Sequence, residues 1–205
     1  RGYGAETIFA SSMETVYAAM EEYRTAHEMH YVHPFSDPHV IAGQGTVGLE
    51  ILEDAPDVDV ITICTGGGGL LAGIAVAVKA LQPGVRIVGV EPEGAPAVTQ
   101  RLAAGIPVNV DHITTIADGL SAPFGGALSQ ALIERNVDDV VLVSDEEIMS
   151  ALRLILERTK LLSEPAGAAG VAALLAGKAG VEPGARAVAT LSGGNIDLLR
   201  LKNLL

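Results

Sequence analysis

The sequence predicts an α/β fold with an open, mostly parallel sheet flanked by helices. Apolar segments typical of buried strands alternate along the chain with alanine-rich segments typical of helices. The stretch from Asp57 to Glu91 contains a strand, a glycine turn, a helix and a second strand, which is a βαβ unit. The 205 residues are 49% hydrophobic, without repeats or long linkers, and suffice for one large domain or one domain and part of another.

The first third of the chain is predicted to contain two short strands and two helices. A strand is expected over residues 5–10, a helix from there to about Met29, and another strand over 31–34. A helix is then expected from Thr46 to Asp54, after a turn formed by Gly43 and Gly45.

The central βαβ unit has the clearest pattern. The β-branched run from Val58 to Cys64 suits a strand that is buried on both faces. Four consecutive glycines follow, at positions 66–69, and an alanine-rich helix is expected over 70–81 before a second strand over 85–90. A glycine turn that begins a helix offers backbone N–H groups and a favourable dipole to an anion, so we expect a phosphate there.

Beyond this unit, helices are expected over 97–104, 126–135, 144–160 and 165–176, and strands over 139–143 and 187–191. Ser144 and Glu147 have the spacing of a capping box. A second glycine turn, Ser192-Gly193-Gly194, follows the last strand. Because ligands bind at the carboxyl ends of strands in such sheets, the two glycine turns are expected to share one site.

Composition excludes several classes of partner. The net charge of −12 disfavours nucleic acid and an anionic membrane surface, since both attract clustered Lys and Arg. No apolar run is long enough to span a bilayer. The single cysteine, Cys64, fits a reducing compartment and is expected to have a structural role at the end of its strand. We therefore expect a cytoplasmic protein that binds neither nucleic acid nor membranes.

Two kinds of phosphate ligand fit the first glycine turn. Gly67, Gly69 and Ala72 match the G-x-G-x-x-A fingerprint of dinucleotide-binding folds, and Glu91 ends the next strand at about the distance where an acidic residue binds a ribose. This interpretation predicts an NAD-binding Rossmann domain. It leaves the second glycine turn unexplained.

The other interpretation rests on five motifs in order: HPFSDPHVIAGQGT (33–46), TGGGGLLAGIA (65–75), IADGLS (116–121), LLSEPAGAAGVAAL (161–174) and LSGGNID (191–197). Together they resemble the serine/threonine dehydratase family of fold-type II, tryptophan-synthase-like pyridoxal phosphate enzymes, which includes serine racemase. The resemblance implies that residues 1–35 are a remnant of the small domain. It also implies that residues 36–205 are the large pyridoxal phosphate-binding domain.

The resemblance further implies roles for particular residues. Backbone N–H groups of the first turn should bind the cofactor phosphate, and the Ser192 hydroxyl should face the pyridine nitrogen. Gly119 should line the site beside the ring, and Phe35 should lie near the substrate. The residues implied in phosphate binding are Gly66, Gly67, Gly68, Gly69 and Leu70.

A cation site is also implied by the resemblance. Glu91 and the backbone carbonyl of Ala95 resemble its ligands, for a monovalent or a divalent ion. The third acidic ligand that some members use would fall at Ala97, which has no ligating side chain. A carboxylate that caps the end of a strand is the alternative role for Glu91.

The sequence departs from the family pattern in one respect that affects the chemistry. The lysine that forms the Schiff base and the Ser-Gly-Asn-His substrate loop are both absent. The only lysines are Lys79, Lys160, Lys178 and Lys202, on predicted helices or in the tail. We therefore expect no catalytic residue in this chain, and we expect it to be a fragment that begins partway through the small domain.

The function implied for the complete protein is a lyase that converts L-threonine, L-serine or both to a 2-oxo acid and ammonia. A serine racemase-like enzyme shares nearly every motif and stays an alternative. Two further alternatives are a non-catalytic, cofactor-binding half of a split enzyme and the dinucleotide-binding domain. The expected partners are a small amino-acid substrate and either further copies of the chain, as a homo-oligomer, or the missing N-terminal segment.

Overall fold

The computed structural model describes residues 2–9 and 13–205. They form two compact units, Arg1–His33 and Pro34–Leu205. The first unit contains one helix, α1 (Met13–Ala26), within its described residues. The strand expected over residues 5–10 is wrong for its described part, because residues 5–9 are irregular, and Ala10 lies outside the described residues. The strand expected over 31–34 is also wrong.

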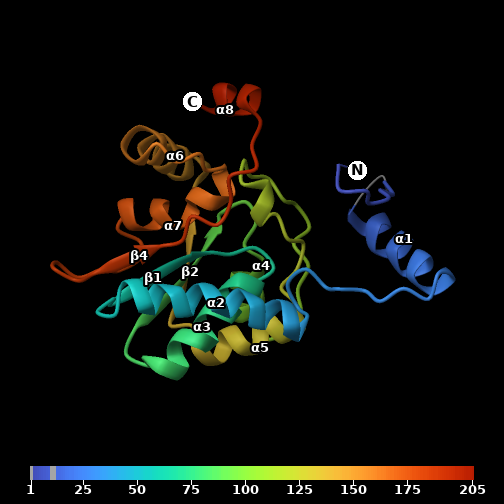
Figure 1. The fold of residues 1–205 in the computed structure, drawn as a ribbon, viewed down its shortest axis with the longest axis horizontal. Helices are drawn as coiled ribbons and strands as arrows, with labels where there is room; N and C mark the ends of the chain where they lie inside the picture. The colour runs from blue at the N-terminus through green and yellow to red at the C-terminus, as the bar shows by residue number, and fades with distance from the viewer. Residues whose placement is uncertain (1, 10–12) are drawn as a thin grey trace. The chain divides into compact units, whose positions relative to one another are not determined.

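The second unit is built on a four-stranded parallel sheet (Figure 1). Its strands are β1 (Val60–Cys64), β2 (Arg86–Pro92), β3 (Asp139–Val143) and β4 (Ala187–Ala189). Their order in the sheet is β3-β2-β1-β4, and every neighbouring pair is parallel. The predicted α/β class and parallel sheet are confirmed, because buried β-branched residues supply the central strands.

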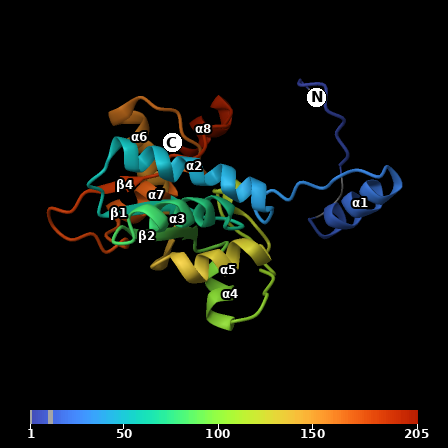
Figure 2. The same cartoon turned by 60° about the horizontal axis from the view of Figure 1, so that its bottom comes forward.

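Helices cover both faces of this sheet (Figures 1 and 2). On one face α2 (Pro38–Asp54), α3 (Gly69–Leu81) and α5 (Ala127–Asn136) bury Ile41, Ile74 and Ile133 in one apolar cluster. On the other face α6 (Asp145–Thr159) and α7 (Pro165–Leu175) bury Leu152 and Ala169 in a second cluster. The sheet therefore contributes to two apolar clusters, one on each side.

The helix α2 begins eight residues earlier than the sequence indicated. Asp37 caps it by accepting hydrogen bonds from the backbone N–H groups of His39 and Val40, at 2.8 and 3.1 Å. The expected turn at Gly43 and Gly45 lies inside the helix because α2 packs directly on α3. A Cβ added at Gly73 of α3 would lie only 2.4 Å from the carbonyl oxygen of Ile41.

Three further elements complete this unit, and only the first of them was predicted from the sequence. They are α4 (Ala97–Ala104), the 3₁₀ helix η1 (Asp118–Leu120) and α8 (Leu198–Leu204). The capping box at the start of α6 is confirmed: the Ser144 hydroxyl accepts from the Glu147 backbone at 3.2 Å, and the Glu147 carboxylate accepts from the Ser144 backbone at 2.8 Å.

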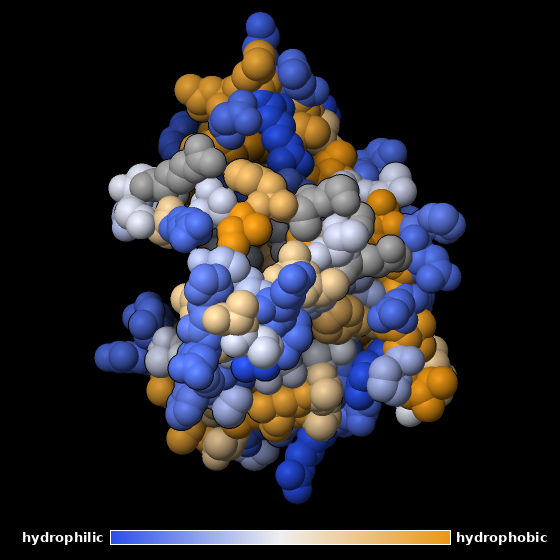
Figure 3. Space-filling view, turned by 90° about the vertical axis from the view of Figure 1, so that its right-hand side faces the viewer, coloured by the Kyte–Doolittle hydropathy of each residue, from blue (hydrophilic) through white to orange (hydrophobic). Residues whose placement is uncertain are grey.

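Hydrophilic and hydrophobic residues are interspersed over the face drawn in Figure 3. In the described part of the chain, no helix combines the length and the apolar character needed to cross a bilayer.

Candidate functional site

The first glycine turn lies between β1 and α3. Gly68 precedes the helix in the left-handed region, with φ 90° and ψ 1°, a conformation that glycine adopts without steric cost. The backbone N–H of Ala72 donates to the Gly68 carbonyl at 2.9 Å and makes the first bond of the helix. The N–H groups of Gly69, Leu70 and Leu71 therefore have no acceptor within α3, and the positive end of the helix dipole lies beside them. This donor set suits an anion.

Phe35 packs directly on this turn. A Cβ added at Gly67 would lie 2.3–2.5 Å from carbon atoms of the Phe35 ring, and one at Gly69 would lie 2.8 Å from the Phe35 Cα. The ring also contacts Phe124, with centroids 5.7 Å apart. Any side chain at position 67 would displace Phe35, so the turn needs glycine at this point.

Helix α5 begins against the same turn. The Gly67 carbonyl accepts hydrogen bonds from the Ser129 hydroxyl at 2.9 Å and from the Gly126 N–H at 3.3 Å. Ser129 is fully buried. Sequence reasoning missed this serine; its only signal is a small polar residue three positions after the glycine pair that starts α5.

The second glycine turn reaches the same edge of the sheet. Strands β1 and β4 are parallel, so both turns leave from their carboxyl ends. The Thr190 N–H donates to the Thr62 carbonyl at 3.0 Å, and the Cys64 N–H donates to the Thr190 hydroxyl at 3.3 Å. Ser192 follows two residues later, and its hydroxyl is near enough to lower the pKa of the Cys64 thiol. Both turns thus lie at the carboxyl edge of the sheet, as predicted, and a ligand site that they share stays a prediction.

Cys64 lies at the centre of this junction. Its sulfur accepts a hydrogen bond from the Gly170 N–H at 3.3 Å and donates to the Gly167 carbonyl at 3.5 Å. Burial raises the pKa of the thiol above its usual value, against the weaker effect of these hydrogen bonds. The neutral thiol joins β1 to α7, in keeping with the structural role expected for it.

Gly119 forms part of a third turn at this edge. A Cβ added there would lie 2.9 Å from the Ala166 Cβ and 3.6 Å from a Glu164 carboxylate oxygen. A Cβ added at Gly193 would lie 2.2 Å from the same Glu164 oxygen. Glu164 therefore lies between the Gly119 turn and the Ser192–Gly193 turn.

Sequence reasoning identified the motif that contains Glu164 but gave this residue no role. Partial burial raises the pKa of the Glu164 carboxyl, the negative charge of Asp118 raises it further, and Arg200 opposes both. The available signal was an acidic residue directly before Pro165, at the start of α7.

Glu91 lies near the end of β2 and is fully buried. One carboxylate oxygen accepts from the Val98 N–H at 2.7 Å, and the other accepts from the Thr99 N–H and hydroxyl at 2.8 and 2.7 Å. Burial raises its pKa to about 7, despite these hydrogen bonds. Glu91 thus caps the first turn of α4. Ala95, also buried, donates its N–H to the Pro92 carbonyl.

The lysines make contacts elsewhere. Lys79 pairs with Asp138 at 2.7 Å, Lys178 pairs with Glu147 at 2.7 Å, and Lys160 donates to a backbone carbonyl of its own helix. None of these contacts involves a residue of the glycine turns. Among the described residues, no group of three or more His, Cys, Asp or Glu side chains could hold a metal ion.

Residues 1–193 match the family described as pyridoxal-phosphate dependent enzyme, and the chain belongs to this family. This finding favours pyridoxal phosphate over the dinucleotide that the G-x-G-x-x-A fingerprint had left open.

Individual relatives agree with this assignment. The chain is 42% identical over 199 residues to L-threonine ammonia-lyase of Thermotoga maritima, covering 97% of this chain and 49% of that protein. Over 197 residues it is 40% identical to phenylserine dehydratase of Ralstonia pickettii, and the match covers 96% of this chain and 60% of that protein. The chain thus spans about half the length of the curated relatives it matches.

Solved structures show the same fold. Maize serine racemase superimposes with a TM-score of 0.91 at 36% identity, over 98% of this chain and 63% of that one. The processed form of threonine deaminase isoform 2 from Solanum lycopersicum gives a TM-score of 0.90 at 31% identity, over 97% and 55%. The predicted tryptophan-synthase-like fold class is confirmed by these neighbours.

Proposed function

We propose that the complete protein is a pyridoxal phosphate-dependent ammonia-lyase. It acts on L-threonine, L-serine or both and gives a 2-oxo acid and ammonia. The observation that carries the proposal is the convergence of the two glycine turns at the carboxyl edge of the sheet, in a family that depends on this cofactor. Relatives named L-threonine ammonia-lyase and L-threonine dehydratase support the substrate class.

The chain's own residues fit the cofactor. The N–H groups at the start of α3 lack intrahelical acceptors, so the backbone of Gly66–Gly69 and Leu70 would hold the phosphate. Gly119 and Gly193 have no side chains at the edge where an aromatic ring would lie, and Ser192 offers a hydroxyl to the ring nitrogen. Phe35, packed on the turn, would line the substrate side.

When bound, pyridoxal phosphate supplies an electron sink that promotes loss of the β-hydroxyl of the substrate. The neutral Ser192 hydroxyl would donate a hydrogen bond to the ring nitrogen and would leave that nitrogen unprotonated. The first glycine turn would hold the phosphate, and Gly119 would lie beside the ring. The four lysines lie outside these turns, so the covalent anchor would come from outside this chain.

The decisive experiment uses the complete protein with pyridoxal phosphate and measures 2-oxo acid formed from L-threonine and from L-serine. Formation of 2-oxo acid from at least one substrate is expected; none from either would overturn the proposal. The chain of residues 1–205 alone should be inactive. If this chain turned over substrate without an added partner, the expectation that it contains no catalytic residue would be wrong.

A serine racemase-like activity is the second candidate, and its support is the similarity to maize serine racemase. Chiral chromatography of serine after incubation with the complete protein separates the two. Appearance of D-serine faster than 2-oxo acid would favour the racemase. A third candidate, a non-catalytic half of a split enzyme, requires that the chain bind the cofactor and gain activity only with a second chain.

We also propose a homo-oligomeric assembly in the cytoplasm. An open groove lined by apolar side chains of α2, α3 and α5 supports the homo-oligomer. The exposed side chains that line it include Leu49, Val76 and Leu128. The single cysteine supports the cytoplasmic location. Sedimentation of the complete protein tests the assembly, and a monomer at micromolar concentration would contradict it.

The cation site at Glu91 and the Ala95 carbonyl stays a proposal. It requires the Glu91 carboxylate to release or share its hydrogen bonds from α4, and calorimetric titration with Mg²⁺ or K⁺ tests it. No heat of binding from either ion would contradict it.

A further inference from the structure

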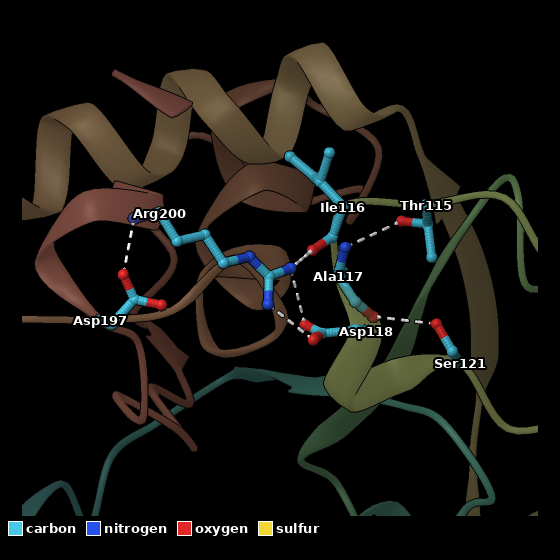
Figure 4. Close-up of polar contacts among 7 residues, drawn as sticks. All are labelled: Thr115, Ile116, Ala117, Asp118, Ser121, Asp197 and Arg200. Carbon is cyan, nitrogen blue, oxygen red and sulfur yellow. Dashed lines mark hydrogen bonds and ion pairs between the residues drawn. The ribbon is translucent and has the colours of Figure 1, made fainter. Parts of the chain in front are cut away.

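Arg200 connects α8 to the turn that carries Gly119 (Figure 4). Its guanidinium donates to both carboxylate oxygens of Asp118, at 2.7 and 3.1 Å, and to the Ile116 carbonyl at 3.0 Å. Asp197 caps α8 by accepting from the Arg200 backbone N–H at 2.8 Å. One side chain thus holds two points on the segment that leads into Gly119.

The Gly119 turn is itself a compact unit. Leu120 N–H donates to the Ala117 carbonyl at 2.8 Å, and Ser121 N–H donates to the Asp118 carbonyl at 3.1 Å. Upstream, the Asp145 carboxylate accepts from the Thr115 hydroxyl at 2.6 Å and from the Ile116 N–H at 3.1 Å, so α6 fixes the segment before the turn. Asp145 therefore holds this segment from the α6 side, and Arg200 holds it from the α8 side.

Arg200 also lies among carboxylates of like charge. The carboxylates of Asp118 and Glu164 are close enough to repel each other electrostatically, and Arg200 attracts both. Asp197 adds a further negative charge near Arg200. Removal of the guanidinium would leave Asp118 and Glu164 without this cation and would remove two contacts that hold the Gly119 turn, to the Asp118 carboxylate and the Ile116 carbonyl.

The Gly119 turn packs against the other two turns of the candidate site through few intervening atoms. Glu164 lies between Gly119 and Gly193, and both glycines approach it closely. Gly66, at the start of the first turn, packs on the same unit: a Cβ there would lie 3.1 Å from the Leu120 Cα. The Gly119 turn therefore borders the ring side of the site and touches the phosphate side only at Gly66, before the N–H groups that begin α3.

We propose that Arg200 is a positioning residue of the cofactor site, which holds the Gly119 turn in place on the side of the site where the ring of the cofactor would lie. The proposal rests on the proposed function, because it concerns the ring of pyridoxal phosphate. Arg200 acts on the ring side of the site only. The phosphate side is formed by the start of α3, which Arg200 does not touch in any contact of the described residues.

This separation gives the test two ligands. Calorimetry in phosphate-free buffer measures the affinity of residues 1–205 for pyridoxal phosphate and for inorganic phosphate. Arg200→Met is expected to lower the affinity for pyridoxal phosphate about fivefold, a modest loss because the ion pair is partly exposed. The affinity for inorganic phosphate should stay unchanged within about twofold. Arg200→Lys keeps the positive charge but cannot donate to both carboxylate oxygens of Asp118 as the guanidinium does. Its affinity for pyridoxal phosphate should therefore lie between those of Arg200→Met and the unsubstituted chain.

The matched control is Arg153→Met. Arg153 also holds α8, through the carbonyls of Leu204 and Leu205 at 3.4 and 2.9 Å, but does not touch the Gly119 turn. It should change neither affinity. Asp118→Asn gives a second variant with the same expected direction as Arg200→Met, and circular dichroism melts verify that each variant is folded.

The outcomes are distinguishable. Failure of the unsubstituted chain to bind pyridoxal phosphate would overturn this role, whereas the proposed function is judged separately, by 2-oxo acid formation in the complete protein. Binding by the unsubstituted chain that Arg200→Met leaves unchanged would overturn only the role of Arg200. An equal loss of affinity for both ligands would show a general structural effect of the substitution and would also overturn the role of Arg200.

Discussion

The buried carboxyl of Glu91 should make the stability of this protein fall as the pH rises. Burial raises its pKa from 4.5 to about 7 in the folded chain. The folded state therefore binds the proton more tightly than the unfolded state between these values. The stabilisation is fully present below about pH 4.5 and is lost as the pH rises through about 7.

The size of the effect follows from the same shift. The difference between 4.5 and about 7 corresponds to about 3 kcal/mol, at about 1.4 kcal/mol for each tenfold change in proton affinity. Asp118, Asp138 and Glu147 have lowered pKa values and give the opposite pH dependence. A comparison with Glu91→Gln isolates Glu91, because glutamine does not titrate and the other carboxyls are common to both proteins.

Urea denaturation of both proteins at several values between about pH 4.5 and pH 8 measures the difference in free energy of unfolding. The free energy of unfolding of the unsubstituted chain, measured relative to that of Glu91→Gln, should fall by about 3 kcal/mol as the pH rises across this range. Thr99→Val removes one donor to the carboxylate, so it should extend the loss of stability to higher pH. A difference that stays constant with pH would refute the reasoning.

Three further predictions concern the turn, a helix cap and the cysteine. Gly68→Ala should lower the free energy of unfolding by about 1–2 kcal/mol, because alanine is strained in the left-handed region; an unchanged urea midpoint would contradict it. Ser144→Ala should cost about 1 kcal/mol through loss of the capping box, while Ser150→Ala, on the same helix, serves as the control. Cys64 should react with a thiol reagent only after unfolding, since its thiol is buried and its pKa is raised; prompt labelling of the folded chain would disprove this.

Local sequence signals were sufficient for the elements that depend on local chemistry. The buried β-branched runs placed β1 and β2, and the spacing of Ser144 and Glu147 placed the start of α6. Glycine after a strand carboxyl end also located both turns of the candidate site. These features depend on propensity and on hydrogen bonds within a few residues, which the sequence records directly.

The errors arose where contacts between distant segments decide the structure. Gly43 and Gly45 were interpreted as a turn, but α2 runs through them because it packs on Gly73 of α3. The segments 5–9 and 31–34 have strand-like composition and lack a neighbouring strand within the described residues. Glu164 and Arg200 were missed because their roles depend on Asp118, which is far away in sequence.

The contacts of the Gly67 carbonyl have a consequence for ligand binding. It is held by two donors from the start of α5, so its peptide plane is fixed. In a trans peptide the N–H points opposite to the carbonyl, and the N–H of Gly68 is therefore directed away from α5. The anion cradle is pre-organised by a neighbouring helix, and a phosphate that enters it meets little entropic cost of ordering the loop.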